Sequence, residues 1–213
     1  MAKKTDPRLL QAMQAIASGQ PLQAESVCRS VLAERKRDDL AMALLAQACN
    51  ASGKYDEAMQ LIRSAIAKNN KRADYHGLLA DMLTTQGDFR GALGAYDKAL
   101  KLQPNHHGVI AGKANTWLRL NEPQKAKKLV EPIVKEGGED LTIAIVYAKS
   151  LIEDGDPHGA ADVLLARLPA SKEPVETRRT LYFVLGKAME KSGEHKSAFE
   201  AYEEGNKLSA GNF

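Results

Sequence analysis

Apolar residues recur along this chain three and four residues apart, in short segments separated by Gly, Asn and Pro. This spacing places them on one face of an α-helix. Ala, Leu, Lys and Glu, which favour helices, are abundant, and runs of β-branched residues are few. The larger apolar side chains include Leu45, Leu79, Leu83, Trp117, Leu151, Ile62, Tyr96, Val130, Leu164 and Tyr202. The pattern predicts an all-α protein with these residues in its core.

The helical segments repeat with a period of 34 residues. The copies span residues 5–38, 39–72, 73–106, 107–140, 141–174 and 179–212, with a connection over 175–178. Position 20 of each copy is Ala, at Ala24, Ala58, Ala92, Ala126, Ala160 and Ala198. Position 8 is also small, at Ala12, Ala46, Ala80, Ala114, Ala148 and Gly186. Small residues let two helices approach closely, so residues 1–213 are predicted to form a single α-solenoid of six antiparallel helix–turn–helix repeats.

Each repeat carries a turn signal at position 15: Gly19, Gly53, Gly87, Asn121, Gly155 and Gly193. These residue types accept a positive φ and end a helix. Two residues later, Pro21, Pro123 and Pro157 mark the start of the second helix, where proline is favoured. Pro132 falls inside a second helix and predicts a kink or a shortened helix.

Composition excludes several classes of function. The 30 basic and 27 acidic residues are interspersed, and a formal charge of +3 is too small to indicate binding to nucleic acid or a membrane surface. No segment approaches the ~18 apolar residues that cross a bilayer. Cys28 and Cys49 form no C-x-x-C motif, so we expect buried thiols, no metal or other cofactor, and a cytoplasmic protein.

The repeat resembles the tetratricopeptide repeat (TPR) family. The match is best over 73–106, at Leu79, Ala80, Gly87, Phe89, Ala92, Tyr96, Ala99 and Pro104. The resemblance implies a right-handed superhelix whose groove, lined by the first helix of each repeat, binds an extended peptide or a partner segment. It places positions 2, 5, 9 and 12 of those helices in the groove. The candidate residues at or next to these positions are Gln47, Asn50, Asp81, Thr84, Asn115, Arg119, Lys149, Phe183 and Lys187.

Family members that bind a chain-terminal carboxylate pair Lys and Asn on consecutive first helices. Asn115 occupies one suitable position, but Ala111 and Val146 stand where partners of the clamp are needed. The groove becomes basic toward Arg119, Lys149 and Lys187. We therefore expect an internal, acidic segment as its ligand.

The last repeat has a more specific resemblance. Residues 181–190 (LYFVLGKAME), 198–202 (AFEAY) and 204–206 (EGN) resemble the repeat that precedes the catalytic domain in bacterial TPR-containing sulfotransferases. This resemblance implies a substrate-recognition or dimerisation module whose catalytic domain follows Phe213. Phe199 and Leu208 have no following helix to cover them, which predicts an open C-terminal edge and a homodimer through that repeat.

No motif for catalysis is present. The sequence has no phosphate-binding G-x-x-x-x-G-K-[ST] loop, no H-E-x-x-H motif and no G-x-S-x-G elbow. The histidines are scattered, with His106 and His107 in a predicted turn. The predicted function is a protein-interaction scaffold, the N-terminal module of a larger protein; the alternative is the sulfotransferase module.

Overall fold

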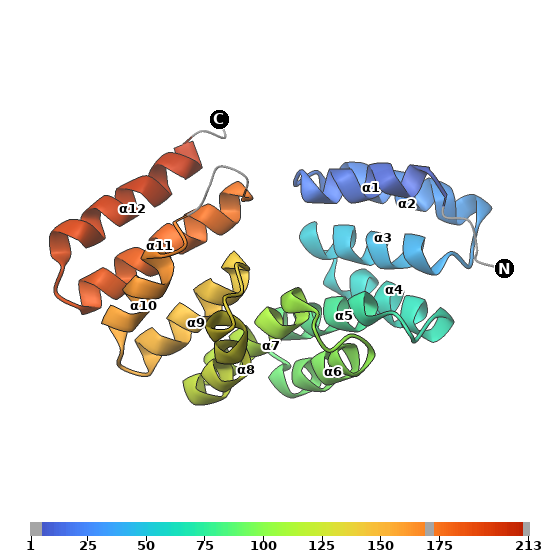
Figure 1. The fold of residues 1–213 in the computed structure, drawn as a ribbon. Coiled ribbons are helices and arrows are strands. Elements are labelled where there is room, and N and C mark those ends of the chain that lie inside the picture. The colour runs from blue at the N-terminus through green and yellow to red at the C-terminus, as the bar shows by residue number, and fades with distance from the viewer. Residues whose placement is uncertain (1–5, 169–172, 211–213) are drawn as a thin grey trace. The chain divides into compact units, whose positions relative to one another are not determined.

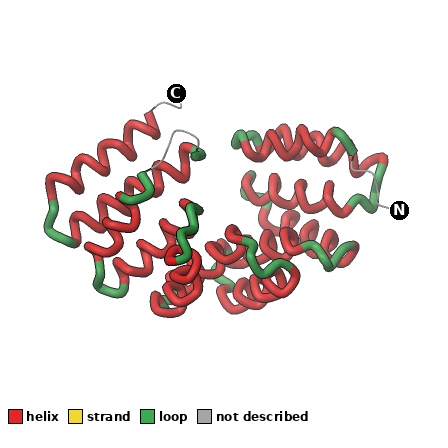
Figure 2. The backbone as a smooth tube through the Cα atoms, viewed as in Figure 1, coloured by secondary structure: helices red, strands yellow, loops and turns green. Residues whose placement is uncertain are grey.

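The computed structural model describes residues 6–168 and 173–210, which form twelve α-helices and no strand (Figures 1 and 2). The all-α prediction is confirmed. The predicted ends of repeats five and six at 169–172 and 211–212, and Phe213, lie outside the described residues. The chain divides into two compact units, residues 1–104 and 105–213. A single superhelix through both units stays a prediction.

The first helix of each repeat is called the A helix and the second the B helix. Unit 1 contains α1 (Arg8–Ala17), α2 (Pro21–Glu34), α3 (Asp39–Ala51), α4 (Tyr55–Lys68), α5 (Ala73–Thr85) and α6 (Phe89–Leu102). Unit 2 contains α7 (His107–Arg119), α8 (Pro123–Lys135), α9 (Leu141–Glu153), α10 (Pro157–Leu165), α11 (Val175–Lys191) and α12 (His195–Ala210). Odd numbers are A helices and even numbers are B helices.

Positive-φ residues join the two helices of every hairpin. Gly19, Gly53, Gly87, Gly155 and Gly193 have φ between 68° and 86°, and Asn121 has φ 58°. After α3 the amide of Lys54 donates to the carbonyl of Cys49 at 2.8 Å, and that of Gly53 donates to Asn50 at 3.1 Å. This bonding satisfies carbonyls at the helix end. The turns therefore lie where the Gly and Asn signals predict them.

Prolines and aspartates mark the N-termini of several helices. Pro21, Pro123 and Pro157 are the first residues of α2, α8 and α10. Aspartates cap other helices: the side chain of Asp38 accepts from the amide of Ala41, and that of Asp140 accepts from Ile143. These bonds satisfy amides that have no partner within the helix.

The sixth repeat starts earlier than predicted. Residues 175–178 form the first turn of α11, which has 17 residues, and are not a connection. They contain neither Gly nor Pro, and the carbonyl of Pro174 accepts hydrogen bonds from the amides of Thr177 and Arg178 at 3.0 Å. The helix can therefore begin directly after the proline. Pro132 lies inside α8 without ending it, since α8 has 13 residues and α2, α4 and α6 have 14. The predicted kink stays a prediction.

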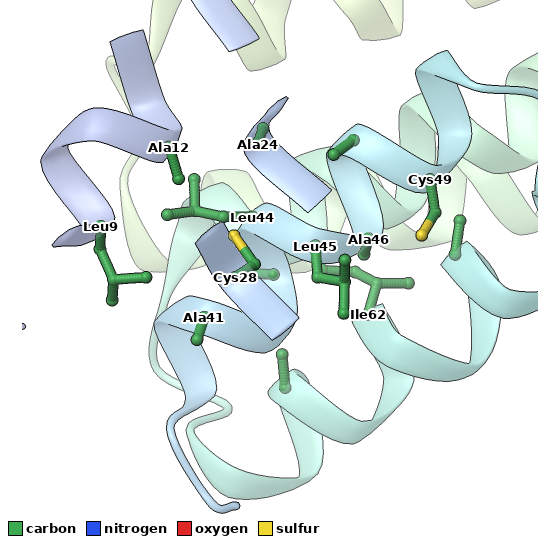
Figure 3. Packing of buried hydrophobic residues seen from close by; sticks show 14 of the residues in the cluster. Leu9, Ala12, Ala24, Cys28, Ala41, Leu44, Leu45, Ala46, Cys49 and Ile62 are labelled. Carbon is green, nitrogen blue, oxygen red and sulfur yellow. The ribbon is translucent and has the colours of Figure 1, made fainter. Parts of the chain in front are cut away.

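Within each unit the A helices contact one another, whereas among the described residues the B helices contact only A helices. Small residues form the tight part of the core, since Ala12, Ala24, Ala46 and Ala58 are inaccessible to solvent. Figure 3 shows this packing in unit 1, where Leu9, Leu44, Leu45 and Ile62 fill the space between helices, together with the thiols of Cys28 and Cys49. The A helices of each unit therefore form a layer onto which the B helices pack.

Candidate functional site

The nine candidate groove residues lie on A helices in two groups. In unit 1, Gln47 and Asn50 are on α3, and Asp81 and Thr84 are on α5. In unit 2, Asn115 and Arg119 are on α7, Lys149 is on α9, and Phe183 and Lys187 are on α11. α3 contacts α5, and α9 contacts both α7 and α11 (Figure 1). Each group therefore lies on neighbouring helices of one unit.

The charged group of the unit 1 set is already bonded within its own hairpin. The hydroxyl of Tyr96 on α6 donates to Asp81 Oδ1 at 2.5 Å. Thr84 also bonds locally, since its Oγ1 donates to the carbonyl of Ala80 at 2.9 Å. Gln47 is exposed and Asn50 is half-buried. Asp81 and Thr84 therefore each use part of their hydrogen-bonding capacity within the chain.

The unit 2 set has a different electrostatic character. Lys187 Nζ lies 2.9 Å from Glu153 Oε1, so this ion pair links α11 to α9. Its hydrogen bond and charge hold the pKa of Glu153 below its usual range. Asn115 and Lys149 are half-buried, and neither has a hydrogen-bond or ion-pair partner among the described residues. We define the α7–α9–α11 face by Asn115, Arg119, Lys149, Phe183 and Lys187.

The Lys149 ammonium is the unusual charge on this face. Burial lowers its pKa, and the positive charge of Lys187 lowers it further. Removing a charge from water without a counter-ion carries a free-energy cost. The half-buried amine is thus a group that an incoming anion would stabilise.

Phe183 supports the C-terminal hairpin as well as the face. Its ring is 37% exposed and packs against Tyr202 of α12, with centroids 6.0 Å apart and an interplanar angle of 41°. Gly205 lies under the same ring, because a Cβ there would be 3.2 Å from Phe183 Cε2. Part of the phenyl ring therefore packs within the hairpin, and part is exposed.

Two of the positions expected in the groove are buried in the fifth repeat. Ile145 at position 5 and Ile152 at position 12 are 4% and 3% exposed, because α9 packs against A helices on both sides. Glu153 and Lys191, which are not among the nine candidates, are exposed charges at position 13. Their place could have been predicted from the repeat, because position 13 lies one helical turn beyond position 9, on the same face of the helix. Arg119, one of the candidates, also occupies position 13.

Within the described residues there is no group of three or more His, Cys, Asp or Glu side chains able to hold a metal ion. The searched helices also include none with the length and apolar composition that crossing a bilayer requires. Both thiols are buried, and burial raises the pKa of each to about 11, which makes them poor nucleophiles.

The helix pairs, their left-handed turns and their small interior residues match a known repeat. The family model described as tetratricopeptide repeat matches residues 15–82 and 83–149. The chain belongs to the tetratricopeptide repeat family. A TPR repeat-containing protein of Methanocaldococcus jannaschii is 26% identical over 153 residues, which cover 70% of this chain and 27% of that protein. The chain thus spans about a quarter of the length of this relative.

Solved TPR structures share the fold. A thermophilic TPR protein of Thermus thermophilus superposes with a TM-score of 0.71 at 18% identity, covering 84% of this chain and 97% of that one. YrrB, described as a TPR protein with an unusual peptide-binding site, gives 0.56 at 13% identity and covers 87% and 93%. The O-GlcNAc transferase of Thermobaculum terrenum gives 0.57 at 25% identity, over 62% of this chain and 27% of that one.

Proposed function

We propose that this TPR chain is a protein-interaction module that binds an extended peptide segment on the α7–α9–α11 face. The observation that carries the proposal is the pair Asn115 and Lys149. They occupy position 9 on adjacent helices, are half-buried, and have no polar partner among the described residues. An amide donates and accepts hydrogen bonds, so Asn115 suits a peptide backbone. The ammonium of Lys149 suits a polar side chain on the same peptide.

The spacing of the helices fits an extended ligand. Packed helices lie about 8–10 Å apart, so three A helices span about 20 Å. An extended chain rises about 3.3 Å per residue, so about six ligand residues cross the face. YrrB, which shares this fold, is described as having an unusual peptide-binding site. That similarity supports peptide recognition as the class of function.

The experiment is a selection with the full chain. Blocked twelve-residue peptides from a random display library are enriched on the immobilised protein, and their affinities are measured by fluorescence anisotropy. We expect micromolar binders that lose most of their affinity to the double variant Asn115→Ala, Arg119→Ala. The variant should keep its helical circular dichroism and its melting temperature, because both positions are at least partly exposed.

The matched control is Lys128→Ala, an exposed residue on α8 in the B-helix layer of the same unit. It should leave the affinities unchanged. Enriched peptides that bind the double variant as tightly as the parent chain would move the site away from the α7–α9–α11 face. A selection without any enriched peptide would contradict peptide binding itself.

A second candidate is the substrate-recognition or dimerisation module of a larger transferase, specifically a TPR-containing sulfotransferase. It is supported by the resemblance of residues 181–206 to the repeat before such a catalytic domain. The O-GlcNAc transferase of Thermobaculum terrenum is an enzyme, and the region that matches this chain makes up 27% of its length. The gene sequence beyond the codon for Phe213 tests it. A continuing frame with a sulfonate-donor-binding loop would support this candidate, and an immediate stop codon would oppose it.

We also propose a cytoplasmic location and self-association through the C-terminal hairpin. Phe199 on α12 is 69% exposed, and an apolar ring of this size gains free energy when a second surface covers it. Sedimentation velocity on the full chain and on Phe199→Ser tests the second point. A concentration-dependent dimer that the substitution weakens is expected, whereas a monomer at all concentrations would exclude it.

A further inference from the structure

The two lysines of the α7–α9–α11 face differ in whether they have a counter-ion. Lys187 has its counter-ion in Glu153, 2.9 Å away, and Glu190 accepts from the hydroxyl of Tyr202 at 2.9 Å. Lys149, on the helix between α7 and α11, has no anion among the described residues. The face therefore presents one half-buried positive charge without a partner.

We propose that Lys149 is a specificity-determining residue of this face and selects the carboxylate of an internal Asp or Glu side chain in the bound peptide. The inference rests on the proposed function, because it names the chemistry of one residue in that peptide. The two oxygens of a carboxylate can accept from the ammonium and from a second donor such as the amide of Asn115.

The number of available charges argues for a carboxylate over a phosphate group. A phosphoserine carries close to two negative charges at neutral pH, so it calls for a second cation. The other lysine of this face, Lys187, already has Glu153 as its counter-ion, 2.9 Å away, and Arg119 is exposed to solvent, so neither adds a second half-buried charge. A carboxylate carries one charge, which matches the charge of the half-buried Lys149 ammonium.

Burial makes the discrimination strong. Hydrogen bonds to charged groups are stronger than neutral ones, and they strengthen further where solvent is partly excluded. The lowered pKa of Lys149 agrees with this environment, since its causes are burial and the charge of Lys187. Replacing the ligand's Glu by the isosteric Gln should therefore weaken binding by about tenfold, as one charge-assisted hydrogen bond predicts.

The test uses the full chain and three pools of blocked twelve-residue peptides, random except at one central position. That position holds Glu, Gln or phosphoserine. The affinity of each pool is measured for the parent chain and for three variants. Lys149→Met keeps the apolar stem of the side chain, and Lys149→Arg restores a cation. Lys128→Met on α8 is the control. Melting followed by circular dichroism establishes that each variant is folded.

We expect the Glu pool to bind the parent chain, Lys149→Arg and Lys128→Met about tenfold more tightly than the Gln pool. Lys149→Met should bind both pools equally. If Lys149→Met still binds the Glu pool more tightly than the Gln pool, another residue causes the preference. Equal binding of the Glu and Gln pools by the parent chain would overturn the inference. A phosphoserine pool that binds best would overturn the choice of a carboxylate.

These outcomes are separable from failure of peptide binding itself. If the enriched peptides bind the parent chain and depend on Asn115 and Arg119, the proposed function stands whatever the central residue. If Lys149→Met does not fold, the comparison of Glu with Gln on Lys149→Arg and on the parent chain still decides the preference. If no pool binds the parent chain, the inference about the carboxylate is overturned, and the proposed function is decided by the enriched peptides alone.

Discussion

The phenol ring of Tyr202 on α12 packs directly against the α-carbon of Gly186 on α11. A Cβ at residue 186 would lie 2.5 Å from Tyr202 Cε1 and 2.7 Å from Cδ1. The ring is held in this position because its hydroxyl donates to Glu190 Oε2 at 2.9 Å and its face packs against Phe183. This contact explains why position 8 is Gly in the sixth repeat and Ala in the other five.

Gly186→Ala should therefore destabilise unit 2. Alanine favours a helix over glycine by about 1 kcal/mol, but overpacking a rigid ring costs about 1–3 kcal/mol. We expect a net loss of about 1 kcal/mol in the free energy of unfolding. Urea denaturation followed by circular dichroism measures it.

Gly94→Ala on α6 is the matched control. Nothing lies within 4 Å of a Cβ built at Gly94, so the same substitution should stabilise unit 1 by up to about 1 kcal/mol. Opposite signs for the two variants are the expected result. A stabilising Gly186→Ala would mean that the ring of Tyr202 moves away without cost.

Much of the fold could be predicted from sequence because its signals are local. Gly, Asn and Pro restrict φ within one or two residues, so the turns and the starts of α2, α8 and α10 follow from residue type. The start of α11 at Val175 directly follows Pro174 and lies four residues before the sixth copy of the 34-residue frame. A helix can extend before its repeat begins wherever no breaker stops it.

The site could be predicted only in part. The repeat register identifies residues on the A helices, such as Asp81 and Lys149, but not which of them already has a partner. Tyr96 bonds Asp81 from the B helix of the same hairpin, and Lys187 bonds Glu153 from the next repeat. Such pairings depend on distances between helices, which the spacing of residues along one helix does not contain.

Glu25 predicts a pH-dependent contribution to stability. Its buried carboxylate on α2 binds Lys54 Nζ at 2.6 Å, and this hydrogen bond is the main reason that its pKa is lowered. A carboxyl with a lowered folded pKa contributes stability above its unfolded value of about 4.3 and loses that contribution as pH falls through the folded pKa. Glu25→Gln should cost about 1 kcal/mol at pH 7, because Lys54 is partly exposed and the solvent screens the pair.

The difference between the parent chain and Glu25→Gln should shrink as pH falls from 5 toward 2, measured by thermal melting at fixed ionic strength. Glu136→Gln, at an exposed position at the end of α8, serves as the control and should change stability little at any pH. A cost for Glu25→Gln that is equal at pH 7 and at pH 2.5 would assign the effect to packing.

Asp140 should stabilise the start of α9 in two ways. Its Oδ1 accepts from the amide of Ile143 at 3.0 Å, and its Oδ2 lies 3.0 Å from Nδ1 of His107 on α7. Asp140→Ala removes both contacts and should cost about 1–2 kcal/mol. Asp140→Asn keeps the cap, so its unfolding midpoint in urea should lie between those of the parent chain and the alanine variant. Equal losses in the two variants would show that the cap contributes nothing.

Asn121 offers the most direct test of the repeat pattern, because it alone among the described residues combines a side chain with a positive φ, 58°. A left-handed backbone costs most residues about 1–2 kcal/mol, and Asn tolerates it better than Ala. Asn121→Ala should therefore lower the free energy of unfolding by about 1 kcal/mol. Asn121→Gly should leave it within about 0.5 kcal/mol, because relief of strain offsets the greater entropy of the unfolded chain. If urea denaturation gave the same stability for both variants, backbone conformation would not be what places Gly or Asn at this position of every repeat.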